Sequence, residues 1–147
     1  MSTTPLTHSD VVEVLGLGSK PKRSSLDLAA AIESGLPVTA LDRVSRFIAP
    51  SDAAFKHRFV SKATLARRRI ARSRQLSPEE SGRLARVAHV WTLARDVWGD
   101  DDSARAFLFR PHPLLKQRTP IEMALGTDLG ARLVEDILGR LRHGSAP

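Results

Sequence analysis

Apolar residues recur along this chain at the spacing of one helix face, i, i+3, i+4 and i+7, and short segments rich in Ser, Thr, Gly and Pro separate the runs that show it. These separating residues are the ones that commonly begin and end helices. No segment alternates apolar and polar residues over the length of a strand, and no Asn-Gly or Asp-Gly pair marks a hairpin turn. The pattern therefore predicts an all-α protein.

The first half of the pattern predicts four short helices. The first covers residues 26–34, and the second begins with Thr39 as its N-cap and carries apolar residues at i, i+3 and i+7. Ser51 is expected to cap a short third helix, and Ser61 is expected to cap the fourth. The third and fourth helices are each about two turns long and a few residues join them, which is the layout of a helix-turn-helix.

Two capping boxes mark helix starts in the second half. Ser77-Pro78-Glu79-Glu80 opens a long helix, with Ser as the N-cap, Pro at the first position and Glu closing the box. The apolar stripe of this helix includes Trp91 and Trp98, which we expect to be anchors of the core. Thr119-Pro120-Ile121-Glu122 repeats the box, and Thr127 caps a last helix with a wide apolar stripe. This half is predicted to be a small helical domain.

Residues 1–25 differ in composition from the rest of the chain. They are rich in Ser, Thr, Pro, Gly and Lys and contain one short apolar group, at residues 11–15. Such a composition predicts a flexible N-terminal arm. With 147 residues in all, the chain is long enough for one sizeable domain or for two small ones.

Basic charge is concentrated in residues 56–74, which contain eight Lys or Arg and no Asp or Glu. The whole chain has a net charge of +7, so the 15 basic and 16 acidic residues outside this stretch nearly cancel. The bland interpretation is a solvated helix face, but the stretch holds no acidic residue that could pair with its own cations at i, i+4. A local block of this kind favours a surface that neutralises phosphates, and hence a nucleic-acid contact.

The helix that opens at Ser61 is the candidate recognition helix. If Leu65 is its buried anchor, the polar side chains on its other faces are free to reach DNA. The predicted DNA-binding residues are Lys62, Thr64, Arg67, Arg68, Arg69 and Arg72. The glycine that usually lies in the turn of this motif is absent, and Phe59 stands near its expected place.

Composition and spacing argue against an enzyme. There is no cysteine, and the five histidines lack the spacing of metal ligands, so disulfides, thiol redox chemistry and a zinc site are not expected. The Gly-rich residues 16–20 do not have the spacing of a phosphate-binding loop, and no strand precedes them. No Ser or Asp stands near a His in a recognisable nucleophile context. We predict no catalytic residue, no metal and no cofactor.

Membrane association is not expected either. No window approaches the ~20 apolar residues that a membrane span requires, and the N-terminus lacks the charged and then apolar regions of a signal peptide. We therefore expect a cytoplasmic protein.

The motifs of the second half, taken in order and with their spacing, resemble the toxin-binding domain of the Xre/MbcA/ParS family of bacterial antitoxins, the partners of RES-domain toxins. The resemblance is carried by Leu76-Ser77-Pro78-Glu79-Glu80-Ser81, Arg83-Leu84, Gly99-Asp100, Ala104, Phe107-Leu108, Pro111, Thr119-Pro120, Thr127, Gly130, Leu138-Gly139-Arg140 and His143-Gly144. Gly35-Leu36-Pro37 and the segment 61–69 extend it to the Xre-like DNA-binding half of the family.

The resemblance implies a protein of three parts: a flexible arm (1–25), an Xre-like helix-turn-helix module that binds DNA and dimerises (26–75), and a toxin-binding domain (76–147). It implies an antitoxin of a RES-Xre type II system that inhibits an NAD-degrading RES toxin by placing its C-terminal segment in the active site, and that represses its own operon by binding operator DNA. A homodimer within a larger toxin–antitoxin complex is expected.

The same resemblance implies which residues would contact the toxin: Arg140, Arg142, His143, Gly144, Ser145, Ala146 and Pro147. The chain departs from the family where Gly82 replaces an acidic residue, where Phe107 lacks a neighbouring Trp, and at Lys116-Gln117, where the family commonly has glycine. The alternative function is a stand-alone helix-turn-helix transcriptional regulator whose second half is a helical dimerisation domain.

Overall fold

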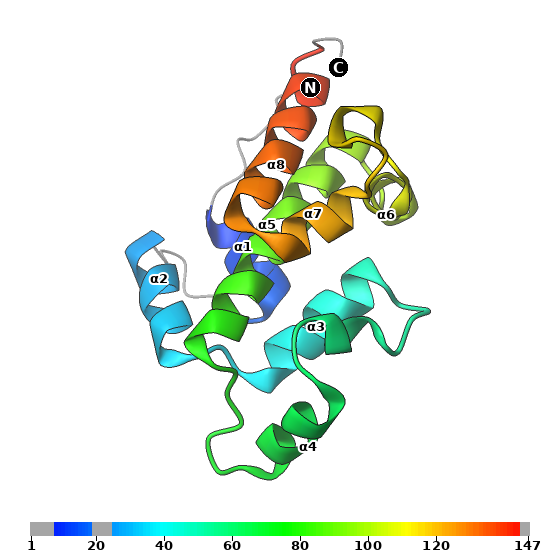
Figure 1. The fold of residues 1–147 in the computed structure, drawn as a ribbon. Helices are drawn as coiled ribbons and strands as arrows, with labels where there is room; N and C mark the ends of the chain where they lie inside the picture. Colours follow the sequence, from blue (N-terminus) through cyan, green and yellow to red (C-terminus); the bar gives the residue numbers. More distant parts are fainter. Residues whose placement is uncertain (1–7, 19–24, 145–147) are drawn as a thin grey trace. The chain divides into compact units, whose positions relative to one another are not determined.

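The computed structural model describes residues 8–18 and 25–144, and this part of the chain is built from helices without any strand (Figure 1). The elements are, in order, α1 (His8–Leu15), α2 (Ser25–Ser34), α3 (Val38–Ile48), the 3-10 helix η1 (Phe55–Arg58), α4 (Lys62–Ile70), α5 (Pro78–Trp98), α6 (Asp101–Phe109), the 3-10 helix η2 (Pro113–Leu115), α7 (Pro120–Gly126) and α8 (Asp128–Arg142). The all-α prediction is confirmed. The chain divides into two compact units within α5, between Ala85 and Arg86.

The first unit includes a helix within the segment for which a flexible arm was expected. The apolar group at residues 11–15 lies along α1, where Val11, Val12 and Leu15 are buried, and α1 packs against α2 and α3. The structure differs here from the expected flexible arm because these few apolar side chains pack on α2 and α3, and composition alone does not show such a partner. The remainder of the expected arm, residues 1–7 and 19–24, lies outside the described residues.

The C-terminal end of α1 is held by an arginine of α3. The Arg43 guanidinium donates to the backbone oxygens of Glu13 (3.1 Å) and Val14 (3.3 Å). Carbonyls in the last turn of a helix have no partner within the helix, so a donor from a neighbouring element satisfies them.

Two helix starts of the first unit differ from the sequence prediction. Helix α3 begins at Val38 with Pro37 as its N-cap, so Thr39 lies inside the helix. The Val38 N–H, which has no partner within the helix, donates to the Arg74 oxygen (3.0 Å). No α-helix begins at Ser51. The segment forms only the short η1, and the Asp52 carboxylate accepts from the Ala54 N–H (3.0 Å) in the loop before it.

The segment before α3 is joined to the segment before α5. The Leu76 N–H donates to the Leu36 oxygen (2.8 Å), and the Leu36 N–H donates to the Ser81 hydroxyl (2.8 Å). Gly35 has φ +96°, and a β-carbon there would collide with the Leu76 oxygen, so this position requires glycine. The first turns of α5 are in this way tied into the core of the first unit.

The second unit is built from the rest of α5 with α6, α7 and α8. Helix α7 packs against α6 and α8, and Val134, Ile137 and Leu138 of α8 are buried. Gly130 lies at the close approach of α7 and α8, where a β-carbon would collide with the Met123 oxygen. Both predicted caps are confirmed, because Thr119 accepts from the Glu122 N–H and Thr127 from the Gly130 N–H.

The two tryptophans differ in their surroundings. Trp91 exposes 2% of its surface and is the core anchor that the sequence predicted. Trp98 exposes 42%, so the expectation of a second core anchor is wrong. Trp98 is the last residue of α5, and Gly99 with φ +84° ends the helix there, so no further turn of α5 covers its ring.

The loop between α6 and α7 contains the pair at which the sequence departs from the family. Lys116 and Gln117 both have a left-handed backbone, with φ of 53° and 66°. The loop is closed by the His112 N–H, which donates to the Arg118 oxygen (3.0 Å), and by the Gln117 N–H, which donates to the His112 oxygen (3.0 Å). Two residues with side chains thus adopt the conformation that glycine adopts at least cost.

No helix among the described residues has the length and apolar content needed to cross a membrane. The same described part of the chain holds no group of three or more His, Asp or Glu side chains placed to bind a metal ion.

We expect Gln117→Gly to stabilise the protein. A left-handed backbone costs a residue with a β-carbon about 1 kcal/mol, and glycine avoids this cost. The gain in stability is smaller than that, because glycine also has more conformational freedom in the unfolded chain. The midpoint of urea unfolding should rise by the equivalent of about 0.5 kcal/mol. Arg118→Gly is the matched control, because Arg118 is exposed in the same loop without a positive φ and its replacement should lower the midpoint. A lower midpoint for Gln117→Gly would contradict the prediction.

Candidate functional site

The candidate recognition helix α4 is capped as the sequence predicted. The Ser61 hydroxyl accepts from the Thr64 N–H (3.2 Å) and donates to the Thr64 hydroxyl (2.8 Å). Leu65 exposes 2% of its surface and is the buried anchor of the helix. Its other faces are therefore available for polar contacts.

The turn before α4 does not need the glycine that is missing from it. Phe59 has φ −98°, which any residue adopts, and it exposes only 4% of its surface. Its ring packs edge-on against Phe55, with the centroids 5.6 Å apart. The phenyl ring is part of the core that fixes the connection between η1 and α4, and the helix-turn-helix layout is retained.

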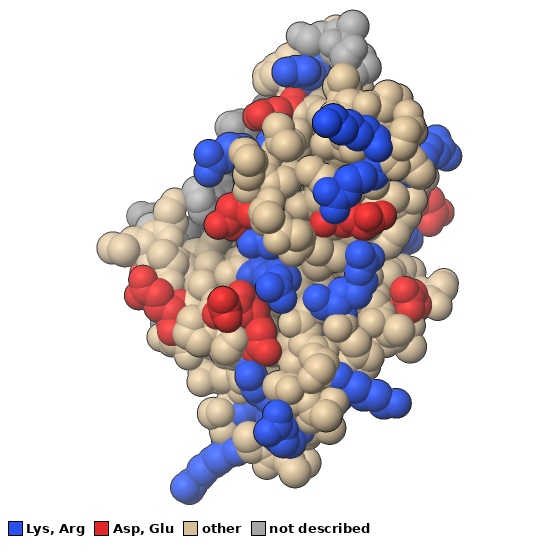
Figure 2. All heavy atoms as spheres, viewed as in Figure 1, with Lys and Arg blue, Asp and Glu red and all other residues tan. Residues whose placement is uncertain are grey.

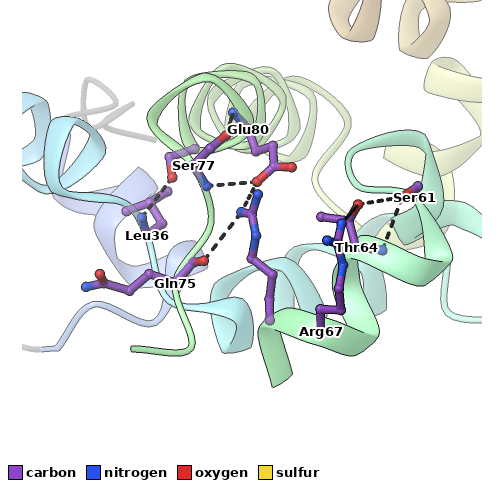
Figure 3. Close-up of polar contacts among 9 residues, drawn as sticks. Leu36, Ser61, Thr64, Arg67, Gln75, Ser77 and Glu80 are labelled. Atoms are coloured by element: carbon purple, nitrogen blue, oxygen red, sulfur yellow. Dashed lines mark hydrogen bonds and ion pairs between the residues drawn. The ribbon is translucent and has the colours of Figure 1, made fainter. Parts of the chain in front are cut away.

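Arg68 of α4 points to α5 and pairs with a residue of the predicted capping box. Its guanidinium binds the Glu80 carboxylate and lies 3.4 Å from the Gln75 oxygen. The same Glu80 oxygen accepts from the Ser77 N–H (2.8 Å), and the Ser77 hydroxyl accepts from the Glu80 N–H (3.1 Å), which completes the box. Figure 3 shows the start of α5 with Ser77 and Glu80 near Gln75, and it shows Ser61, Thr64 and Arg67 of the α4 region to the right of them.

Arg69 makes a second link, to α3. Its two terminal nitrogens donate to the two oxygens of Asp42, at 2.9 and 2.8 Å, in a bidentate pair. The hydrogen bonds from Arg69 lower the pKa of the Asp42 carboxyl, with smaller contributions from the charges of Lys56 and Arg46, and the same pair raises the pKa of Arg69.

The basic stretch 56–74 is therefore partly neutralised, although it contains no acid of its own. Its partners, Asp42 and Glu80, lie 27 and 12 residues away along the chain from the arginines that they bind. Sequence reasoning recognised Glu80 only as part of a capping box and did not pair Asp42 with any cation. No pattern at helical spacing connects either acid to α4, so nothing in the sequence signals these pairs.

The remaining candidates for DNA binding differ in exposure. Lys62, Arg67 and Arg72 are exposed and form no ion pair within the described residues, whereas Thr64 is half-buried and accepts from Arg67 (3.2 Å). At the lower end of the face shown in Figure 2, where Figure 1 places α4, several Lys and Arg side chains gather. The exposed charge of the stretch is thus collected around one helix.

The candidate toxin-binding residues lie at the end of α8. Arg140 is exposed, whereas Arg142 pairs with Asp96 of α5 at 2.9 Å. His143 is the C-cap, and its N–H donates to the Gly139 oxygen (3.1 Å). Gly144 is exposed, with φ +72°. Ser145, Ala146 and Pro147 lie outside the described residues.

Two further arrangements of the second unit were not predicted. Arg86 donates to the Ala124 oxygen (2.7 Å) and the Leu125 oxygen (3.0 Å) at the end of α7 and pairs with Asp128 at the start of α8 (2.8 Å). An arginine of α5 therefore holds the α7–α8 junction, where carbonyls of a helix end need donors. In addition, Trp98, Phe107 and His112 line an open pocket of about 370 Å³.

We expect Asp42→Asn to lower the free energy of unfolding by about 1 kcal/mol at pH 7, because a half-exposed bidentate pair is lost. The pKa of Asp42 is lower in the folded than in the unfolded protein, so its stabilisation is fully present above its ordinary pKa of 3.8. It declines below that pH and is lost once the pH falls below the lowered pKa. Urea unfolding from pH 7 to pH 2 should show the variant and the native chain converging, whereas Asp136→Asn, at an exposed site without an ion pair among the described residues, should leave stability unchanged. Parallel curves for Asp42→Asn would contradict this role.

The chain resembles known proteins over both units. Residues 27–89 match the antitoxin Xre-like helix-turn-helix domain, and residues 93–144 match the antitoxin Xre/MbcA/ParS C-terminal toxin-binding domain. The Antitoxin Xre of Photorhabdus laumondii is 31% identical over 84% of each chain. That of Yersinia enterocolitica is 33% identical over 80% of this chain and 79% of its own. That of Pseudomonas putida is 36% identical over 52% of this chain and 47% of its own.

These matches agree with a capped helix-turn-helix that collects exposed cations, followed by a separate helical unit. The chain belongs to the Xre/MbcA/ParS family of antitoxins and combines a helix-turn-helix DNA-binding domain with a toxin-binding domain.

Proposed function

We propose that this antitoxin binds and inhibits a RES-domain toxin that degrades NAD, and that it represses its own operon by binding operator DNA as a homodimer. The observation that carries the proposal is the match of residues 93–144 to a toxin-binding domain directly after a helix-turn-helix match at 27–89. The identity of the toxin rests on the resemblance of the sequence motifs to antitoxins that partner RES toxins.

For the DNA contact, the geometry of α4 supports a division of labour among the six candidate residues. Lys62, Arg67 and Arg72 are exposed and contact phosphates or base edges. Thr64 contributes its hydroxyl at the helix start. Arg68 and Arg69 add positive charge to the surface, but they also hold the helix to its neighbours through Glu80 and Asp42. The helix that enters the groove is in this way fixed before DNA arrives.

For the toxin contact, the last turn of α8 and the segment after it are the proposed inhibitory element. Arg140 and His143 are exposed there, and Arg142 fixes the end of α8 to α5 through Asp96. Residues 143–147 follow a helix end that is held on one side, so they start from a fixed point when they enter the active-site cleft of the toxin.

Operator affinity should depend on the exposed cations of α4. Arg67→Ala should weaken binding to a duplex of the promoter upstream of this gene and lower the log–log salt slope by about one, because one phosphate contact is lost. Arg132→Ala is the control, since Arg132 is an exposed arginine on α8 in the other unit, and it should bind as the native chain does. Fluorescence anisotropy at several salt concentrations measures both effects. Equal affinity and slope for all three proteins would place the DNA contact elsewhere.

The toxin proposal is tested by expressing the native chain with the product of the adjacent gene, purifying the complex and measuring NAD turnover of the second protein alone and in the complex. We expect NAD consumption by the isolated partner and its suppression in the complex. A chain lacking residues 143–147 should still bind the promoter duplex but should no longer suppress NAD loss fully. A neighbour that neither binds nor consumes NAD would contradict the proposed function, and full suppression by the shortened chain would contradict only the role of the tail.

A further inference from the structure

An open pocket of about 370 Å³ lies in the second unit, at the end of α5. Trp98 forms one wall, α6 and the loop after it form the others, and Leu141 of α8 closes it. All of its lining residues fall within 98–141, inside the segment that matches a toxin-binding domain. The pocket therefore belongs to the part of the chain that meets the partner.

Three aromatic rings give the pocket an apolar wall. The Trp98 and Phe107 centroids are 5.9 Å apart, and the Phe107 and His112 centroids are 6.1 Å apart, with the last two rings edge-on. Phe107 is buried, whereas Trp98 leaves 42% of its surface exposed. An exposed tryptophan beside a preformed hollow is the residue type that most often dominates the energy of a protein–protein contact.

The wall is fixed before any ligand binds. The His112 Nδ1 accepts from the Leu114 N–H (3.1 Å), and the His112 N–H donates to the Arg118 oxygen (3.0 Å), so both the ring and its backbone are held. Trp98 and Phe107 lie on helices α5 and α6. A pocket with this little freedom loses little entropy on binding.

The pocket offers hydrogen-bond donors from Arg110 and His112, whereas the hydroxyl of Ser103, its other polar side chain, already donates to Asp100 (2.8 Å). Arg110 is its one charged side chain, is exposed, and forms no ion pair among the described residues. Because Nδ1 of His112 is an acceptor, its ring proton is on Nε2, which leaves that nitrogen as a donor. No carboxylate lines the pocket. An occupant that combines an apolar body with an adjacent carboxylate complements these features.

We propose that this pocket receives an apolar side chain of the toxin, and that a neighbouring toxin carboxylate binds Arg110. This inference rests on the proposed antitoxin function and adds a second anchor beside the C-terminal segment. Its role is affinity, because a side chain in the pocket holds the toxin without needing to reach the toxin's active site.

The test compares truncations of two exposed apolar residues of the same unit. Trp98→Ala should weaken binding of the toxin encoded by the adjacent gene by about tenfold or more, measured by calorimetry with the full-length chain. Leu129→Ala is the matched control, because Leu129 is 64% exposed on α8 and lies outside the pocket, and it should change affinity less than twofold.

Two further variants separate occupancy from folding. Ala106 is exposed at the pocket and makes no contribution to the core, so Ala106→Trp should fill the hollow without loss of stability and weaken toxin binding like Trp98→Ala. Arg110→Glu should weaken it further than Arg110→Lys, because only the first reverses the charge that meets the carboxylate. Unchanged thermal unfolding of Ala106→Trp shows that the effect is on binding.

The outcomes distinguish the pocket from the wider function. If the native chain binds the toxin and both Trp98→Ala and Ala106→Trp bind it with the same affinity, the pocket proposal is overturned and the antitoxin function stays intact. A native chain that does not bind the adjacent gene product at all would overturn the proposed function and, with it, this occupant. If Trp98→Ala instead changed the mass of the antitoxin alone in solution, the pocket would hold a second copy of the chain and the proposal would be wrong.

Discussion

The placement of helix α4 in the DNA-binding unit depends on two ion pairs, the bidentate pair between Arg69 and Asp42 and the pair between Arg68 and Glu80. Helix α4 buries one large anchor, Leu65, and the arginines that follow would repel one another if none were neutralised. Asp42 of α3 and Glu80 of α5 neutralise the two arginines that point toward those helices. The helix is thereby attached on two sides while its outer cations stay exposed. One stretch of charge thus performs two tasks, attachment and recognition.

Glu80 couples two elements because its carboxylate has two partners. It closes the capping box at the start of α5 through the Ser77 N–H, and it binds Arg68 of α4. The start of α5 is in turn tied to the segment before α3 through the Ser81 hydroxyl. The elements around the recognition helix are therefore joined through hydrogen bonds to a single helix start, so a change there would be felt both in helix stability and in the placement of α4.

In the second unit, arginine side chains also link helices to one another. Arg86 holds the junction of α7 and α8, and Arg142 holds the end of α8 to Asp96. These arginines are used inside the unit, whereas Arg110 and Arg140 are among the exposed cations that stay available to a partner. The aromatic pocket at Trp98 and the end of α8 are both features of this rigid frame, which gives the proposed toxin contact an anchor and an inhibitory segment.

The sequence by itself determined where most helices begin and where the charge lies. Ser61, Ser77, Thr119 and Thr127 cap helices as predicted, because a cap is a hydrogen bond between residues three apart and needs no distant partner. Only the tertiary structure decided that α1 packs on α3, that Trp98 is exposed, and that two arginines of the basic stretch turn inward to Asp42 and Glu80. Each of these outcomes depends on which side chains, distant along the chain, meet when the helices pack, and helical periodicity carries no information about that meeting.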